Sequence, residues 1–304
     1  MANAVILDTD LGTDIDDTWA LGMLLASPEV SLEAVITAHA DTPHRAAIVT
    51  KLLDTWGRAD VPVGIGMRGA DLERRPQAAY LDGYGVDDYP GSVVEDGIGL
   101  LIDKVMSTPE PILVAIGPAT NIAAALAREP RIAERARFIG MHGSIRRGYR
   151  GSDDPQPEYN VFIDAEAFRA VLAAPWDITL TPLDTCGIVY LKDAKYAAVR
   201  DSEHAIAREV IANYRAWCEA VELGDRAERR STTLYDTVAV LLAFGSTHLE
   251  RYVEMEDVPI VVRDDGLTAE TETGRVVHAA MGWRDLAGFE DLLVERIDAE
   301  PIAR

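Results

Sequence analysis

The fold of this chain is decided by the stretch Ile6-Leu7-Asp8-Thr9-Asp10-Leu11-Gly12-Thr13-Asp14-Ile15-Asp16-Asp17. Apolar residues 4–7 are typical of a buried parallel strand, and the apolar residues 18–26 that follow predict a helix. Five aspartates lie at this junction, and such crowding is costly unless a positive charge binds there. A hard divalent cation held by oxygen ligands is the simplest such charge. The alternative is a loop whose acids only cap the following helix.

The composition is ordinary for a globular protein apart from a strong acidic bias. The chain has 304 residues, of which 48% are hydrophobic and 26% charged, and its formal net charge is −22. The length is at the upper end for one α/β domain. Because such a charge repels phosphates and anionic lipid headgroups, we expect neither nucleic acid nor a membrane surface as a partner.

The two cysteines, Cys186 and Cys218, form no close-set motif. So few cysteines argue against a disulfide scaffold and favour a reducing compartment. The first strand is expected almost at the N-terminus, which leaves no room for a signal peptide, and no apolar run approaches membrane-spanning length. We therefore expect a cytoplasmic protein.

Strand and helix patterns alternate through the first two thirds of the chain. The expected strands cover residues 4–7, 32–37, 61–64, 111–116, 137–141 and 178–181, and the expected helices cover residues 18–26, 46–56, 94–106, 121–128 and 165–173. Residues 70–91, rich in Gly, Asp and Tyr, predict a long loop, and loops of that length are often functional. The alternation predicts an α/β fold with a single open, mostly parallel sheet flanked by helices.

The pattern changes in the last third. Helices are expected over residues 203–223 and 234–244, and a final helix over residues 289–297. Residues 258–262 and 275–280 predict an antiparallel pair of strands around the turn Asp264-Asp265-Gly266. No repeat, low-complexity tract or linker interrupts the chain. We predict one domain over residues 1–304, with a helical insertion and a small C-terminal antiparallel hairpin.

Polar residues follow several of the expected strands. Ligands of open parallel sheets bind outside the carboxyl ends of the strands, which places Asp10, Ile116 and Met141 along one rim. The acids, asparagine and hydroxyls at these strand ends suit calcium or magnesium and a polyol. The sequence contains no phosphate-binding glycine loop, no H-E-x-x-H, no cysteine cage and no G-x-S-x-G.

Five blocks in order resemble the nucleoside hydrolases of the inosine–uridine preferring type. The blocks are Asp8-Thr9-Asp10 with Gly12 and Asp16-Asp17, Gly117-Pro118-Ala119-Thr120-Asn121, Met141-His142-Gly143, Glu158-Tyr159-Asn160 with Asp164-Ala165-Glu166-Ala167, and Tyr235-Asp236-Thr237-Val238-Ala239. They are similar to the family's D-x-D-P-G-x-D-D, G-P-x-T-N, M-G-G, E-[FY]-N-x-x-x-D-P-E-A and H-D-P-x-A. Leu11 replaces the family's proline, and two extra residues precede the final aspartate pair.

The resemblance implies Ca²⁺-dependent hydrolysis of the N-glycosidic bond of ribonucleosides to free base and ribose. Asp10 would be a calcium ligand and the base that activates a calcium-bound water. Asp17, Asp236 and the backbone carbonyl of Ile116 would be further calcium ligands. Calcium that holds both the ribose hydroxyls and a water would lower the pKa of that water, and the reaction would pass through an oxocarbenium-like state.

The resemblance also implies a set of residues around the sugar, consisting of Asp16, Asn160, Glu158, Met141 and Asp41. Asp16 and Asn160 would bind ribose hydroxyls, and Asp41 falls where the family usually has an asparagine. Because of the two-residue insertion, it stays open whether Asp14 or Asp16 contacts the sugar.

The group that protonates the leaving base stays open as well. Many family members have a histidine just before the last calcium aspartate, and here that position is Tyr235, a poorer acid with an ordinary pKa of about 10. His142 is the second candidate. Candidates for stacking on the base are Tyr80, Tyr84, Tyr149 and Trp217. The basic residues Arg146, Arg147 and Arg150 are expected to neutralise the acidic surface or to guard a pocket mouth.

Two other functions stay open. A nucleoside- or ribose-binding protein without turnover is suggested by Tyr235. A haloacid-dehalogenase-type phosphatase is suggested by residues 8–13, which copy its D-x-D-G-T opening, although no downstream lysine and acid pair are well placed. The expected partner is a small nucleoside in purine or pyrimidine salvage, and the resemblance implies a homodimer or homotetramer.

Overall fold

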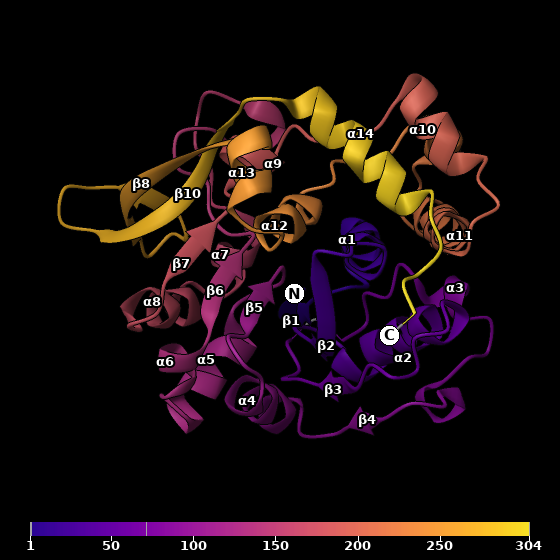
Figure 1. Cartoon of the computed structure of the whole chain (residues 1–304), viewed down its shortest axis with the longest axis horizontal. Coiled ribbons are helices and arrows are strands. Elements are labelled where there is room, and N and C mark those ends of the chain that lie inside the picture. Colours follow the sequence, from indigo (N-terminus) through magenta and orange to yellow (C-terminus); the bar gives the residue numbers. More distant parts are fainter. Residues whose placement is uncertain (1, 71, 304) are drawn as a thin grey trace.

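The computed structural model describes residues 2–70 and 72–303, and a ten-stranded sheet runs through it (Figure 1). The strand order is β4-β3-β2-β1-β5-β6-β7-β10-β8-β9. The strands are β1 (Asn3–Thr9), β2 (Val30–Thr37), β3 (Val63–Ile65), β4 (Val93–Val94), β5 (Ile112–Ala115), β6 (Arg137–Gly140), β7 (Ile178–Leu180), β8 (Val253–Val262), β9 (Thr268–Glu270) and β10 (Arg275–Trp283). The aspartate-rich loop after β1 therefore leaves the sheet between β2 and β5.

Parallel pairing extends from β4 to β7 and on to β10, and the pairs β10–β8 and β8–β9 are antiparallel. The predicted α/β fold, an open and mostly parallel sheet with a C-terminal antiparallel hairpin, is confirmed. The hairpin strands are longer than expected, since β8 begins at Val253 and β10 ends at Trp283. Acidic residues such as Glu254 and Glu256 disfavour a strand by propensity, but here the outward-facing positions of β8 accommodate them.

Helices cover both faces of the sheet (Figure 1). One core contains residues of α1 (Asp16–Leu25), α2 (Thr42–Thr55), α11 (Ala205–Ala220), α12 (Asp236–Leu242) and α14 (Leu286–Ile297), and the other contains residues of α4 (Gly97–Ser107), α5 (Thr120–Arg128) and α8 (Ala165–Ala173). Strand β1 contributes to both, because Val5 and Leu7 belong to the first core and Ile6 to the second. A strand buried on both faces is apolar throughout, as this one is.

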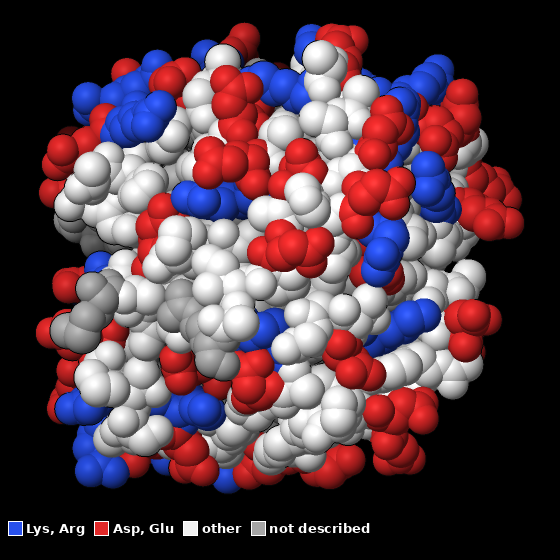
Figure 2. All heavy atoms as spheres, turned by 45° about the vertical axis from the view of Figure 1, so that its right-hand side comes forward, with Lys and Arg blue, Asp and Glu red and all other residues white. Residues whose placement is uncertain are grey.

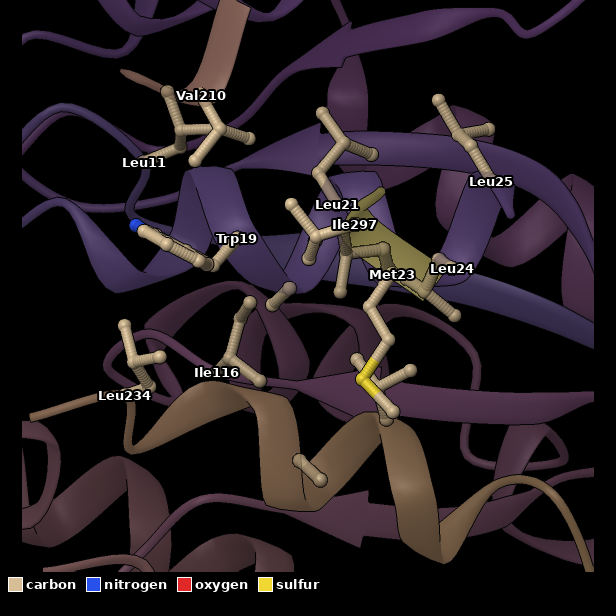
Figure 3. Close-up of a cluster of buried hydrophobic side chains, with 14 of the residues drawn as sticks. Leu11, Trp19, Leu21, Met23, Leu24, Leu25, Ile116, Val210, Leu234 and Ile297 are labelled. Atoms are coloured by element: carbon tan, nitrogen blue, oxygen red, sulfur yellow. The ribbon is translucent and has the colours of Figure 1, made fainter. Parts of the chain in front are cut away.

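Helix α1, which follows the aspartate loop, is fully enclosed, since all ten of its residues are buried. Figure 3 shows its side chains Trp19, Leu21 and Met23 among residues of other elements, Val210 and Ile297 included. A Cβ on Gly22 would lie 2.8 Å from Cγ2 of Ile206 in α11. Glycine at this position therefore allows α11 to pack closely on α1.

The predicted helical insertion lies between β7 and β8. Besides α11 and α12 it contains α9 (Leu183–Cys186), α10 (Asp193–Arg200), η3 (Gly224–Glu228) and α13 (Ser246–Tyr252). Helix α12 packs against α1, and this contact brings the N-terminus of α12 close to the aspartate loop. Residues 221–223, expected to be helical, follow the end of α11, because Glu222 and Gly224 both have left-handed φ angles of 58°.

Several short elements were not expected from the sequence. The predicted loop of residues 70–91 contains α3 (Ala78–Leu81) and η1 (Val86–Asp88), and α6 (Ile132–Arg135), η2 (Tyr149–Gly151) and α7 (Tyr159–Ile163) lie in other connections. Elements of three to five residues are too short to show a helical period.

Figure 2 shows acidic side chains spread over the visible face with basic ones among them. Within the described ranges, no helix has the length and apolar character needed to cross a membrane.

Candidate active site

The loop between β1 and α1 places several carboxylates at the carboxyl edge of the sheet. Its turn contains Gly12 with φ of 116°, a conformation that glycine adopts without steric cost. Asp10, Asp16 and Asp17 are each at most 5% exposed. The loop therefore turns these charged groups inward, against the usual preference of aspartate for solvent.

Side chains from three other segments hold this loop. Arg45 of α2 donates a hydrogen bond to the hydroxyl of Thr13, and Nε1 of Trp217 in α11 donates to the Thr13 carbonyl at 3.1 Å. Nε2 of the fully buried Gln77 donates to the Asp14 carbonyl at 2.5 Å. The conformation of the loop is thus fixed by residues far away in the sequence.

Asp16, Asp17 and Asp236 form a buried cluster. Each offers one carboxylate oxygen, and these three oxygens lie within 4.8 Å of one another. Burial and repulsion among neighbouring carboxylates raise the pKa of all three well above the ordinary value. The hydroxyl of Thr9 donates to Asp17, which orients that carboxylate. Three convergent carboxylates are the donor set that Ca²⁺, Mg²⁺ or Mn²⁺ prefers, so the residues present fit a hard divalent cation.

Asp10 lies beside this cluster and forms a buried ion pair with Arg45. Nη1 of Arg45 is 3.8 Å from Oδ2 of Asp10, and Arg45 is 3% exposed. The charge of Asp10 also helps to raise the pKa of Asp17 and Asp236. Arg45 supplies one positive charge against the four carboxylates of Asp10 and the cluster, so an excess of negative charge remains.

A cavity of about 290 Å³ opens on these carboxylates. Nine of the residues proposed from the sequence line it: Asp10, Asp16, Asp17, Ile116, Met141, Glu158, Asn160, Tyr235 and Asp236. They come from five separate segments of the chain. Asp14 also lines the cavity, and its pKa is raised to about 6, mainly by burial.

Glu158 and Asn160 form the polar wall away from the carboxylate cluster. Glu158 caps α7 and accepts hydrogen bonds from the backbone N–H groups of Gly143 at 3.0 Å and Asn160 at 2.7 Å. Burial is the largest cause that raises the pKa of Glu158, to about 7. Nδ2 of Asn160 donates to the carbonyls of Ile116 at 3.1 Å and Met141 at 3.0 Å. Both donor hydrogens of this amide are therefore used, and its oxygen is the acceptor left for a ligand.

Aromatic side chains form another part of the wall. Tyr149, Trp217 and Tyr235 line the cavity, and the rings of Tyr149 and Tyr235 meet edge to face with centroids 6.1 Å apart. Burial is the main cause that raises the pKa of the Tyr235 hydroxyl above its ordinary value. This hydroxyl therefore stays protonated at neutral pH. The predicted stacking candidates Tyr80 and Tyr84 are not among the lining residues.

The structure does not bring His142 or Asp41 to this cavity. His142 is fully buried on the other face of the sheet, where its ring stacks on Phe168 at 4.6 Å, and burial lowers its pKa to about 3. Asp41 forms an ion pair with Arg75 and lines a different, more open hollow. Neither side chain faces the carboxylate cluster.

Four residues of the site were missed by the sequence interpretation. Thr13, Arg74 and Tyr159 line the cavity, and Arg45 fixes the loop between β1 and α1 by its hydrogen bond to Thr13. Tyr159 stands between two proposed site residues in the block Glu158-Tyr159-Asn160, so the motif itself contained a signal. Arg45 and Arg74 lie outside all five blocks and carry no such signal.

The fold and the cavity define an α/β protein with a buried carboxylate site at the carboxyl edge of a mostly parallel sheet. The family model described as inosine-uridine preferring nucleoside hydrolase matches residues 5–295. The chain therefore belongs to that family.

Relatives and solved structures agree with this assignment. The non-specific ribonucleoside hydrolase RihC of Salmonella agona is 34% identical over 191 residues, 59% of this chain and 60% of that protein. The inosine-uridine preferring nucleoside hydrolase of Leishmania major is 34% identical over 197 residues, 60% of this chain and 61% of that protein. The matched stretch thus spans about three fifths of each relative.

Among solved structures, the plant nucleoside hydrolase PpNRh1 has a TM-score of 0.80 at 24% identity, with 98% of this chain and 100% of that chain covered. A purine-preferring ribonucleoside hydrolase from Gardnerella vaginalis has a TM-score of 0.78 at 23% identity, with 97% and 98% covered. At these identities the likeness establishes the shared fold.

Proposed function

We propose that this protein hydrolyses the N-glycosidic bond of ribonucleosides to a free base and ribose, with Ca²⁺ as its cofactor. The observation that carries the proposal is the convergence of Asp16, Asp17 and Asp236 in one cavity with Asn160 and Glu158. A cation site beside the hydrogen-bonding groups of Asn160 and Glu158 suits an uncharged, hydroxyl-rich sugar. Family membership supports the same reaction.

In this proposal Asp10, Asp17, Asp236 and the carbonyl of Ile116 hold Ca²⁺, and Asp16 reaches the sugar. All five groups line the same cavity, and calcium accepts six to eight oxygen ligands, so solvent and sugar hydroxyls have room to complete the shell. Bound Ca²⁺ would orient the ribose hydroxyls and lower the pKa of a nearby water.

Asp10 takes the proton from the attacking water. Its contact with Arg45 holds the carboxylate in place, as the positioning of a general base requires. Glu158, Asn160 and Met141 position the ribose on the opposite wall. The buried acceptor oxygens of Glu158 and Asn160 stabilise the positive charge that develops on the sugar ring.

Tyr235 is the proposed donor to the leaving base. It lines the cavity immediately before Asp236 in the chain, and its raised pKa keeps the proton on the hydroxyl. Such a group stabilises a leaving base by hydrogen bonding more readily than by full proton transfer at neutral pH. The proposal gives His142 and Asp41 no role, because neither lines the cavity.

The phosphatase alternative loses its support. Its nucleophile would be Asp8, which is fully buried, accepts a hydrogen bond from Asn121 at 2.7 Å and does not line the cavity. A nucleoside-binding protein without turnover stays the second candidate, since no histidine lines the cavity within the described part of the chain.

The test is release of ribose from inosine and uridine by the wild-type protein and by Asp10→Ala, each with Ca²⁺ and with a chelator. Removing the general base should lower kcat by roughly 10²–10⁴-fold while circular dichroism stays native. Asp87→Ala, at an exposed residue outside the cavity, is the matched control. Full activity in Asp10→Ala would contradict the assignment, and saturable nucleoside binding without product would favour the binding protein.

The proposal has three further parts. Cys186 and Cys218 are both free and buried, which suits the proposed cytoplasmic, reducing environment, and the proposed reaction assigns the protein to nucleoside salvage. The chain is proposed to be one domain over residues 1–304, and limited proteolysis should then yield no stable smaller fragment. Sedimentation analysis is expected to give a homodimer or homotetramer.

A further inference from the structure

A second cavity of about 530 Å³ adjoins the candidate active site. The two cavities share Asp14, Trp217 and Tyr235 in their walls. The other walls of the second cavity come from residues 187–190, from η3 and from residues 230–233 before α12. A molecule that extends beyond the first cavity past Tyr235 therefore enters the second.

Three arginines, Arg150, Arg226 and Arg230, line this second cavity. Within residues 2–70 and 72–303, none of the three forms an ion pair with a carboxylate. Neighbouring arginines do: Arg229 pairs with Asp225 at 2.6 Å, and Arg215 of α11 pairs with Glu228 at 2.7 Å. In a chain with a net charge of −22, the gathering of three such arginines in one hollow leaves positive charge available for a ligand.

Hydroxyl groups add to the polarity of the same cavity. Ser231, Thr232 and Thr233 line it. Oγ1 of Thr232 is buried and has no hydrogen-bond partner among the described residues. Among the described residues that line this cavity, Asp14, at the boundary with the first cavity, is the one carboxylate. Guanidinium groups are the donors that bind carboxylates and phosphates most strongly.

The order of the groups identifies which end of a nucleoside would reach the arginines. The carboxylate cluster and Glu158 lie in the first cavity and face the sugar in the proposed function. Trp217 and Tyr235, at the junction, offer the aromatic surfaces that suit a planar base. A base bound between these rings would point its far edge into the arginine-lined cavity.

We propose that this cavity is a subsite for a negatively charged substituent on the leaving base, so that the protein prefers N-ribosides whose base carries a carboxylate. This inference rests on the proposed ribonucleoside hydrolysis. Arg226 is its central residue, because it is only partly exposed, whereas Arg150 and Arg230 are exposed. An arginine shielded from water interacts more strongly with an anion than one on the surface.

The test compares 5-carboxyuridine with 5-carbamoyluridine, which differ in charge but hardly in shape. The ratio of their kcat/KM values in the wild-type protein should favour the carboxylate by about tenfold, and Arg226→Gln should abolish most of that preference. Arg229→Gln removes an arginine from the same segment that pairs with Asp225 and does not line the cavity, so the ratio should be unchanged. Because charge drives the preference, it should shrink in high salt.

Equilibrium binding separates this inference from the proposed function. If neither nucleoside is cleaved, the proposed hydrolysis fails, but calorimetry with the same two compounds still measures the preference for the carboxylate. Equal affinities or equal kcat/KM values in the wild-type protein would overturn the inference, as would a preference that survives both Arg226→Gln and Arg230→Gln. Stronger binding of uridine 5′-phosphate than of 5-carboxyuridine would also overturn it, because the anion would then lie on the sugar.

Discussion

Replacing Asp236 by Asn should stabilise the metal-free protein and weaken its response to Ca²⁺. The side chain of Asp236 forms a cluster with Asp16 and Asp17 and is 4% exposed. An amide of the same shape removes one negative charge and, among the described residues, breaks no hydrogen bond of the carboxylate. The substitution thus isolates the electrostatic cost of the cluster.

The size of the effect follows from the separation of the charges. Two unit charges 4.8 Å apart repel by about 3.5 kcal/mol at an effective dielectric constant of roughly 20. The raised pKa values of all three carboxyls mean that partial protonation already relieves some of this repulsion. We therefore expect Asp236→Asn to raise the free energy of unfolding by about 1–3 kcal/mol without metal, or roughly 2–5 °C in Tm for a chain of this length.

Thermal unfolding in chelator and in excess Ca²⁺ measures both halves of the prediction. Calcium at a hundredfold excess over its Kd would stabilise the wild-type protein by about 2.7 kcal/mol, and Asp236→Asn should lose most of that gain. Asp87→Asn, at an exposed residue outside the cavity, controls for the change of net charge. A variant that is less stable than wild type in chelator, or that keeps the full calcium response, would refute the reasoning.

Two further predictions concern the walls of the site. Asn121→Ala should lower the free energy of unfolding by about 3–5 kcal/mol in denaturant titrations. The reason is that this buried amide forms hydrogen bonds with the Asp8 carboxylate, the Thr37 carbonyl and the Met67 N–H. A loss below about 1 kcal/mol would contradict the prediction. Glu158 ionises near pH 4.5 when unfolded and near pH 7 when folded, so wild-type stability should fall by up to roughly 3 kcal/mol across that interval and then level off. The raised pKa values of the neighbouring aspartates add to the same slope, so Glu158→Gln should reduce it by the contribution of Glu158, and an unchanged slope would assign it to the aspartates alone.

The parts of the fold that could be predicted from the sequence are those with a clear period or a long apolar run. Strand β1 is such a run, and helix α1 follows it as expected. Elements such as α3 and α10 were not predicted because they are short and only partly buried, and their positions depend on contacts with α11 and α14. The start of β8 was not predicted because pairing with β10 overrides the weak strand propensity of its acidic residues. The end of β10 contains Gly282, a residue type that also has a weak strand propensity.

His142 illustrates how position on a strand end decides access to the site. Met141 belongs to the core on the face that carries the cavity, and His142, one residue further, packs against Phe168 on the opposite face. Side chains of an extended segment alternate between faces, so adjacency to Met141 argues against His142 rather than for it. Arg45 could not be foreseen, since an arginine in a helix is usually exposed and only the tertiary structure turns this one inward.

The charge balance around Asp10 explains how the site can form before a cation binds. Without any positive charge nearby, neither an arginine nor a metal ion, four buried carboxylates would oppose folding. With one arginine for each carboxylate, the affinity for a divalent ion would be lost. Arg45 stands between these limits, because it neutralises part of the field of Asp10 and at the same time fixes the loop through Thr13. Arg45→Met should therefore lower the free energy of unfolding more in chelator than in saturating Ca²⁺. A bound ion replaces the missing positive charge but not the hydrogen bond to Thr13. Equal destabilisation in both conditions would mean that Arg45 acts only through Thr13.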